Sequence, residues 1–206
     1  CGIRDFDVDL AYEASLKNEL DGTNRPLGAG KVDTDMFLKY GYVPHMDKGD
    51  GPDEAFMFSA SHTLEYSYSA WAVAQWAKKL GKTEDYDQLM WLSKGWERIY
   101  DPSTNFVRPK KANGQFIGDF NPMQVWRGFQ EGNAWQYTFY VPHDAEGLAG
   151  LLGGKEALEA RLDTLFGMSS ELRGENVSGD ITGLIGQYAH GNEPGHHTVY
   201  MYNRVG

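Results

Sequence analysis

The sequence has few of the features that mark several classes of protein. It contains one cysteine, Cys1, in 206 residues, so no disulfide can form within the chain. No apolar stretch approaches the roughly 18 residues that a membrane helix needs, which predicts that the chain has no membrane span. Clusters of Lys and Arg are missing, and the net charge of −10 repels a phosphate backbone. We therefore expect no nucleic-acid partner.

Aromatic residues, by contrast, are abundant. They make up 14% of the chain, with six Trp and twelve Tyr, while the hydrophobic fraction of 41% and the charged fraction of 23% are ordinary for a folded domain. Packing in a core is the commoner role of such rings. An acidic chain rich in Trp and Tyr also suits a cleft in which sugars stack on rings and carboxylates bind hydroxyls.

Helical periodicity is the strongest structural signal. Apolar residues recur at steps of three and four over residues 59–80, and Gly81 ends the pattern. Thr83, followed by two acidic residues, begins a second helical pattern that runs to Ile99. Two long helices joined by a short turn predict an antiparallel helical hairpin.

The remaining pattern predicts shorter helices and one β-hairpin. Residues 43–53 read as a loop, and residues 103–122 break the helical period around Asn113-Gly114, which predicts a small hairpin insertion. No regular alternation of strands and helices is visible, so we predict an all-α fold of helical hairpins joined by long loops. The shorter helices are expected at residues 7–20, 33–40, 130–140, 145–152, 155–166, 182–190 and 196–202.

One candidate site segment covers residues 129–137. If it is helical, Glu131 and Trp135 lie four residues apart on one face. A carboxyl beside an indole in a poorly solvated cleft has a raised pKa, as a general acid near neutral pH requires. The alternative is an acidic residue in the first turn of an ordinary helix, where it complements the helix dipole.

The second segment is residues 190–197, where a carboxylate, an amide and three imidazoles fall within eight residues. Pro194 begins a turn or helix from whose start Asn192 and Glu193 project. Such a group suits a polyhydroxylated ring or a hard cation, and the equal alternative is a capped helix start with surface histidines. A zinc site is disfavoured because His196 and His197 are adjacent and point to different faces.

At these segments the chain resembles glycoside hydrolase family 92, the calcium-dependent exo-α-mannosidases. The resemblance extends over essentially the whole chain. It is carried by six ordered motifs, which are GIRDFD (2–7), GYVP (41–44), TLEY (63–66), EGNAWQY (131–137), VPHD (141–144) and GQYAHGNEP (186–194).

The resemblance implies a fold and an activity. It implies that residues 1–206 are part of a single catalytic domain, an (α/α)6 toroid whose C-terminal part and accompanying β-sandwich domain lie outside this sequence. The implied reaction is inverting removal of terminal mannose from mannose-containing glycans, of the α-1,2 type, in which one carboxylic acid protonates the glycosidic oxygen and a second carboxylate activates water. A secreted or periplasmic location goes with such a substrate.

The resemblance also implies roles for particular residues. Glu131 corresponds to the proton donor, and the turn after Asn192 corresponds to the loop that shapes the sugar site near the Ca²⁺ ion. We therefore expect Glu193 to be a Ca²⁺ ligand as well as a sugar contact. The full set of expected substrate-binding residues is Trp135, Asn192, Glu193, His196 and His197.

The chain departs from the family pattern at two points. Ser69-Ala70 stands where the family usually has an acidic pair, and the acidic segment that carries the catalytic base lies beyond these residues. We therefore expect the fragment alone to be inactive and to self-associate through an uncovered apolar face. The competing interpretations are a non-catalytic carbohydrate-binding helical domain and a purely structural helical scaffold.

Overall fold

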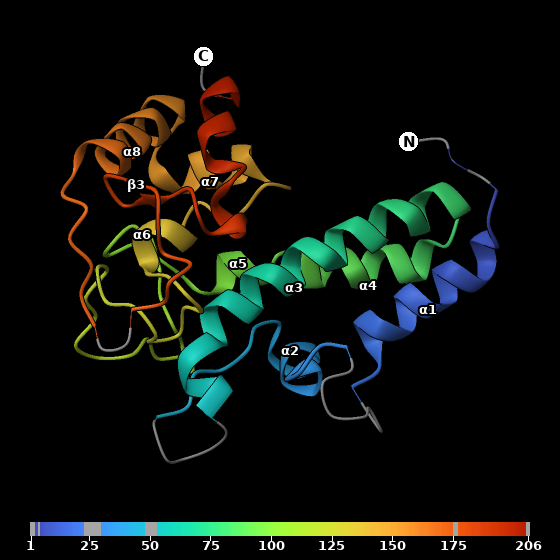
Figure 1. The fold of residues 1–206 in the computed structure, drawn as a ribbon. Coiled ribbons are helices and arrows are strands. Elements are labelled where there is room, and N and C mark those ends of the chain that lie inside the picture. Colours follow the sequence, from blue (N-terminus) through green and yellow to red (C-terminus); the bar gives the residue numbers. More distant parts are fainter. Residues whose placement is uncertain (1–2, 4, 23–29, 48–52, 175–176, 205–206) are drawn as a thin grey trace.

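The structure is a computed structural model that describes residues 3, 5–22, 30–47, 53–174 and 177–204, without the side chains of 53–57. Over these residues the chain is mostly helical with two small two-stranded sheets (Figure 1). The elements are α1 (Val8–Leu20), α2 (Thr34–Tyr40), α3 (Asp53–Leu80), α4 (Thr83–Ser93), α5 (Gly95–Arg98), β1 (Tyr100–Asp101), β2 (Phe106–Val107), α6 (Ala134–Tyr137), α7 (Ala145–Leu152), α8 (Lys155–Gly167), β3 (Leu184–Ile185), β4 (Tyr188–Ala189) and the 3₁₀ helices η1 (Glu193–Gly195) and η2 (Thr198–Arg204).

This arrangement confirms the prediction of a helical chain with small hairpins. The complete six-hairpin ring requires helices outside these residues and stays a prediction. Among the described residues, no helix combines the length and the apolar character needed to cross a membrane.

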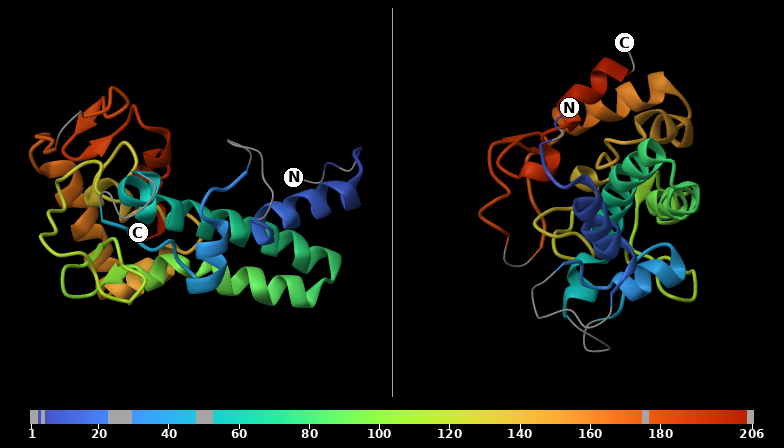
Figure 2. Two further views of the ribbon diagram at one scale, coloured as in Figure 1. Left: turned by 90° about the horizontal axis from the view of Figure 1, so that it is seen from below. Right: turned by 90° about the vertical axis from the view of Figure 1, so that its right-hand side faces the viewer.

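Helix α3 is the longest element and connects the two halves of the molecule. The N-terminal half contains α1, α2 and α4, and the C-terminal half contains α5 to η2. Figures 1 and 2 show it running from the C-terminal half out to the end of a long hairpin with α4, with α1 alongside. Ala70, Ala74 and Ala77 lie on one face of α3 and are fully buried, in one cluster with Leu89 and Leu92 of α4. Small residues at this spacing let the two helices approach closely. The predicted antiparallel hairpin is confirmed.

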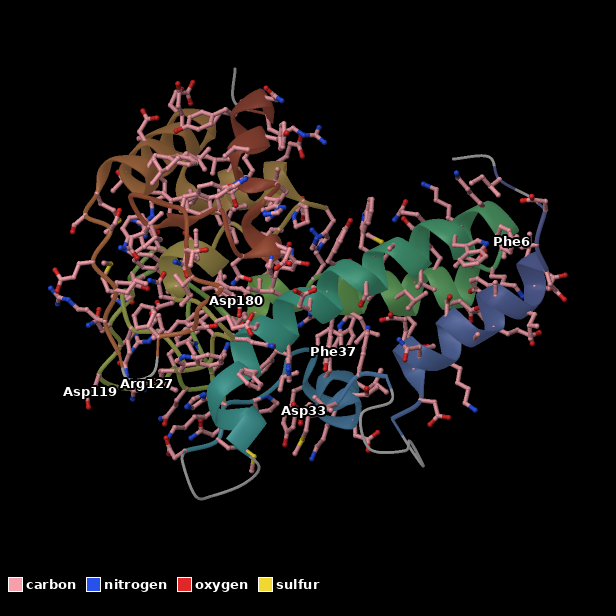
Figure 3. All side chains as sticks on the ribbon, in the orientation of Figure 1. Phe6, Asp33, Phe37, Asp119, Arg127 and Asp180 are labelled. Carbon is pink, nitrogen blue, oxygen red and sulfur yellow. The ribbon has the colours of Figure 1, made fainter. Side chains whose placement is uncertain are left out.

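Two hydrophobic clusters meet along α3. The outer cluster includes Tyr12 of α1 and Phe37 of α2, whose ring points toward α3 (Figure 3). The inner cluster joins Leu64 of α3 to Trp96 of α5 and to α6, α7 and α8. Because α3 packs in both clusters, it is held at one angle about its own axis. This angle determines which of its polar residues face the C-terminal half.

The loop over 43–53 and the hairpin insertion differ from the sequence prediction. Helix α3 begins at Asp53, so the predicted loop over 43–53 is shorter than expected, and residues 48–52 lie outside the described residues. The hairpin insertion is present, but β2 pairs with β1 before it, and near Gly114 only an isolated Lys110–Phe116 bridge forms.

The predicted helix over 182–190 is wrong, because these residues form the β3–β4 hairpin. Gly183 and Gly186 have φ values of +62° and +60°, which interrupt a helix. The apolar residues in this segment belong to two short strands, of which β4 is buried and β3 is not.

Large apolar side chains are exposed on both halves of the molecule. They include Ile3, Leu10, Tyr68, Trp91, Leu151, Ile185 and Tyr200. Self-association through such side chains stays a prediction.

The β3–β4 turn yields a stability prediction. A Cβ atom at Gly186 would lie 2.1 Å from the Leu165 carbonyl oxygen, whereas Gly114, also at positive φ, has nothing within 4 Å of its Cβ position. We expect Gly186→Ala to cost about 3 kcal/mol or more and the matched control Gly114→Ala about 1 kcal/mol, because only the first adds a clash to the backbone strain. Thermal unfolding of the two variants in the full-length protein measures this, and equal unfolding temperatures would contradict the packing described for Gly186.

Candidate functional site

The site is built around a turn at residues 129–133 that precedes the short helix α6. The fully buried Asn133 caps this helix, since its side-chain oxygen accepts from the Gln136 amide at 3.2 Å. The Gln136 side chain accepts in return from the Asn133 amide at 3.0 Å, which completes a capping box. The turn is also joined to α3, because the Gln130 amide donates to Ser61 Oγ at 2.8 Å.

A buried chain of side-chain amides connects this turn to the β3–β4 hairpin. Asn133 Nδ2 donates to Gln187 Oε1 at 2.9 Å, and neither side chain is exposed to solvent. Gln187 Nε2 in turn donates to the carbonyls of Ser169 and Glu171 at 2.7 and 2.9 Å. Buried amides with satisfied partners fix orientation strongly, because breaking any one bond leaves a polar group without water. The turn is therefore held in one place.

The predicted helix over 130–140 is wrong at both ends, because only Ala134–Tyr137 are helical. Glu131 lies in the turn with φ at +50°, and the helix begins only after the cap at Asn133. Glu131 and Trp135 therefore do not share a helical face. A non-glycine residue in the left-handed region costs on the order of 1–3 kcal/mol and persists where the surroundings enforce it, often at functional sites.

Trp135 packs in the core rather than lining an open cleft. It is 7% exposed, and its ring lies edge-on to Phe106 with 4.9 Å between centroids. The guanidinium of Arg161 covers the same ring at 4.1 Å. These contacts give Trp135 a packing role, so its predicted role in sugar binding lacks structural support.

The structure does bring Glu131 together with the turn at 192–197. Asn192 is buried, and its Nδ2 donates to the backbone carbonyl of Glu131 at 2.8 Å. Glu193 follows as the first residue of η1, exposed and close enough to interact electrostatically with Glu131. The two segments that the sequence singled out, separated by about sixty residues, thus lie against each other.

The carboxyl of Glu131 is half-buried and has a raised pKa. Burial is the largest cause, and the negative charges of Asp180 and Glu193 add to it. The direction agrees with the sequence prediction, but the cause differs, since the expected indole is replaced by desolvation and two carboxylates. A carboxyl that keeps its proton to higher pH is suited to act as a general acid.

His196 and His197, the adjacent histidines of the second segment, have different surroundings. His196 is exposed, stacks on His190 at 5.0 Å, and lies with Nε2 2.8 Å from the His190 carbonyl. His197 is half-buried and its Nε2 donates to the Phe139 carbonyl at 2.6 Å. Burial lowers the pKa of His197, which favours the neutral ring near pH 7. The His197 ring thus bonds to the backbone of both Phe139 and Pro194.

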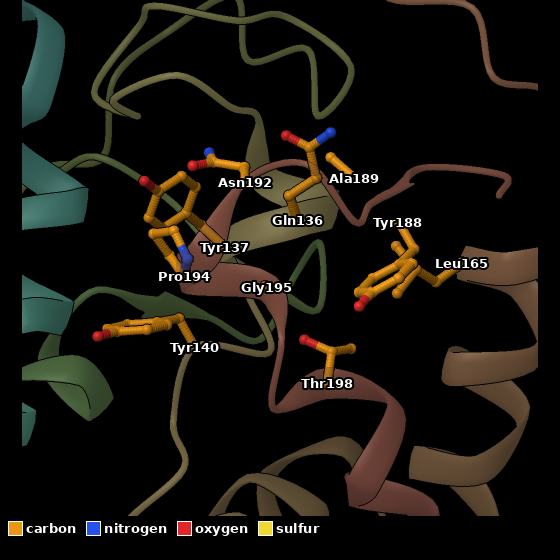
Figure 4. A pocket seen from close by; sticks show the side chains of 10 residues that line it. All are labelled: Gln136, Tyr137, Tyr140, Leu165, Tyr188, Ala189, Asn192, Pro194, Gly195 and Thr198. Carbon is orange, nitrogen blue, oxygen red and sulfur yellow. The ribbon is translucent and has the colours of Figure 1, made fainter. Parts of the chain in front are cut away.

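A pocket lies under the η1 turn (Figure 4), and its lining includes Asn192, whose side chain bonds to the Glu131 carbonyl. It is a small hollow that is open to solvent on one side. Glu131 itself does not line it, whereas Asn192 does. The lining residues are Gln136, Tyr137, Tyr140, Leu165, Tyr188, Ala189, Asn192, Pro194, Gly195 and Thr198, a mixture of aromatic walls and polar groups that is typical of small-ligand pockets.

Sequence reasoning missed several residues of this region. Tyr137 and Tyr140 were read only as part of a helix, and Asp180 had no motif around it. Glu65 belongs to the TLEY motif, and its position as the one carboxylate of the stretch over residues 56–75 was the available signal. In the structure burial raises the pKa of Tyr137, and the negative charges of Glu65 and Glu131 add to the rise, so both carboxyls act on the same phenol.

The predicted Ca²⁺ site is not assembled by these residues alone. Within the described parts of the chain, no three His, Cys, Asp or Glu side chains are grouped so that they could hold a metal ion. Glu193 is near Glu131, yet a Ca²⁺ ion takes six to eight oxygen ligands. The described residues therefore do not fit a complete Ca²⁺ site.

Comparison with known proteins assigns the chain to a family. The family model described as the glycosyl hydrolase family 92 catalytic domain matches residues 1–206. A curated relative from Arthroderma benhamiae, named an uncharacterized secreted glycosidase, is 29% identical over 187 residues, which cover 78% of this chain and 24% of that protein.

Solved structures give the same result. A family 92 α-mannosidase from Bacteroides thetaiotaomicron in complex with mannoimidazole is 35% identical, with a TM-score of 0.81 over 98% of this chain and 26% of that one. A family 92 inverting mannosidase from the same species is 30% identical, with a TM-score of 0.80 over 100% of this chain and 28% of that one. The chain thus spans about a quarter of the length of these relatives.

Proposed function

Since this chain belongs to glycosyl hydrolase family 92, we propose that it forms part of an inverting exo-α-mannosidase that removes terminal mannose from glycans. The observation that carries the proposal is the Glu131 carboxyl, which is half-buried, has a raised pKa and lies on a turn held by Asn192 beside a pocket with aromatic walls. The preference for α-1,2 linkages is part of the same proposal.

In the proposed reaction Glu131 is the general acid. Its proton passes to the glycosidic oxygen as the bond to the anomeric carbon breaks, while a carboxylate on the opposite face of the sugar activates the attacking water. We assign that base to a part of the enzyme outside these residues. Asn192, Glu193, His196 and His197 are proposed to surround the sugar, and supporting this, Asn192 lines the pocket and its amide fixes the Glu131 backbone.

The remaining proposals concern location and assembly. A secreted or periplasmic enzyme is consistent with the name of the Arthroderma benhamiae relative, which describes that protein as a secreted glycosidase. The complete catalytic domain is proposed to be an (α/α)6 toroid. A non-catalytic carbohydrate-binding protein would instead bind mannosides without cleaving them in its full-length form.

Replacement of the proposed acid tests its role. In the full-length protein we expect Glu131→Gln to lower kcat for a mannoside with a poor leaving group by roughly 10²–10⁴-fold, since glutamine supplies no proton. A mannoside with an activated phenol leaving group needs less protonation and is expected to lose much less. The exposed Glu156→Gln is the control for the same chemical change. Turnover of the poor substrate near the wild-type rate would show that Glu131 is not the acid.

The cause of the raised Glu131 pKa leads to a pH prediction. Activity requires protonated Glu131, so its pKa sets the alkaline limb of the profile of kcat/KM against pH. The negative charge of Asp180 raises this pKa, hence Asp180→Asn is expected to move the alkaline limb to lower pH. Added salt is expected to diminish the difference, because Asp180 is exposed and its charge is screened.

The control for this shift is Asp9→Asn, which changes the net charge equally from the exposed surface of α1. It is expected to leave the alkaline limb in place. An alkaline limb at the same pH in wild type and Asp180→Asn would refute the electrostatic coupling between Asp180 and Glu131.

We further propose that the full-length enzyme requires Ca²⁺, with Glu193 as one ligand and the other ligands outside the described residues. Chelation is expected to abolish activity, and Ca²⁺ to restore it better than Mg²⁺, whose smaller octahedral shell suits a wide oxygen site poorly. Glu193→Gln is expected to raise the Ca²⁺ concentration needed for half-maximal recovery. Full activity after exhaustive chelation would rule the requirement out.

A further inference from the structure

A hydrogen bond between α3 and the pocket wall stands outside the roles proposed so far. Tyr140 Oη donates to Glu65 Oε2 at 2.8 Å. Glu65 is half-buried on α3, and Tyr140 lines the pocket. Figure 4 shows the hydroxyls of Tyr137 and Tyr140 directed away from the Gly195 turn, toward the helix α3. One bond thus ties a wall of the pocket to the helix that spans both hydrophobic clusters.

The Tyr140 ring is enclosed by other rings on several sides. It lies edge-on to Tyr137 with 6.3 Å between centroids, to Tyr68 at 6.4 Å and to His197 at 5.4 Å. Edge-to-face contacts of this kind stabilise a ring but tolerate some rotation about it. The bond to Glu65 is directional, so it selects one orientation among those that the rings allow.

The protonation of the pair favours this bond. Burial, followed by the Glu65 charge, raises the pKa of Tyr140, so the phenol keeps its proton and remains a donor. Burial also raises the pKa of Glu65, while the Tyr140 hydrogen bond and the electrostatic influence of His62 and Lys31 oppose that rise. The Glu65 carboxyl can accept the hydrogen bond from the phenol whether the carboxyl is ionised or protonated.

We infer that Glu65 is a positioning residue that holds Tyr140, and that Tyr140 is the wall that determines how a sugar ring is seated beside Glu131. The inference rests on the proposed function. Sugars expose flat C–H faces that pack on aromatic rings, so the tilt of such a wall decides how well the sugar fits. Glu65 acts through Tyr140 and takes no part in the proton transfer.

The test compares four variants of the full-length protein by KM and kcat for an aryl α-mannoside. Tyr140→Phe and Glu65→Leu each remove the bond, and we expect KM to rise about tenfold in each with kcat changed much less. Combining them is expected to raise KM no further, because both remove the same interaction. Glu65→Gln is expected to restore a KM close to wild type, since the amide oxygen still accepts from Tyr140.

A matched control exists in the other half of the molecule. Tyr12 Oη donates to Asp85 Oδ2 at 2.7 Å, between α1 and α4 and away from the pocket. Tyr12→Phe is expected to lower the unfolding temperature without changing KM. A merely structural role for Glu65 and Tyr140 would give this same result, and that outcome would overturn the inference.

Three outcomes of these measurements separate failure of the inference from failure of the proposed function. If Glu65→Gln and Glu65→Leu both lose most of kcat, the charge of Glu65 acts in the reaction itself and the positioning role is wrong. If the wild-type protein cleaves no mannoside at all, the proposed function fails and the inference fails with it. Wild-type activity with unchanged KM in Tyr140→Phe and Glu65→Leu removes the inference alone.

Discussion

The hydrogen bond between the buried amides of Asn133 and Gln187 is the contact on which the site depends. Asn133 caps α6 with its oxygen and reaches the β3–β4 hairpin with its nitrogen, so one side chain fixes both segments. The turn before it is then constrained to the left-handed conformation at Glu131. Because the side-chain oxygen and nitrogen of both Asn133 and Gln187 are bonded and shielded from water, the turn has no inexpensive alternative arrangement.

The other parts of the site are positioned by hydrogen bonds to the same turn. Asn192 binds the Glu131 carbonyl, so the η1 turn lies against residue 131, and Ser61 binds the Gln130 amide from α3. Helix α3 is itself held by packing at both ends, through Ala70 and Ala74 on one side and Leu64 on the other. Rigid helices thus position a site whose chemistry is carried mostly by turns.

The successes and failures of sequence reasoning have separate physical origins. The α3–α4 hairpin was predictable because a long amphipathic repeat leaves few ways to bury its apolar face. Residues 130–140 and 182–190 were misread because short apolar spacings fit a helix and a turn equally well. In the first case an Asn cap decided the outcome, and in the second two glycines at positive φ did. The predicted Glu131–Trp135 pairing failed for the same reason.

The sequence by itself determined the mostly helical class, the long hairpin and, through ordered motifs, the family and the two segments that meet at Glu131 and Asn192. Local periodicity suffices for the helical class and the hairpin, because both depend on residues close together in the chain. The order of residues within the motifs suffices for the family. Only the tertiary structure decided that Trp135 is covered by Phe106 and Arg161 and that Asp180 and Glu193 raise the Glu131 pKa. It also decided that Glu65 reaches Tyr140. Burial and the distances between charges arise from contacts between residues far apart in sequence, which no local pattern encodes.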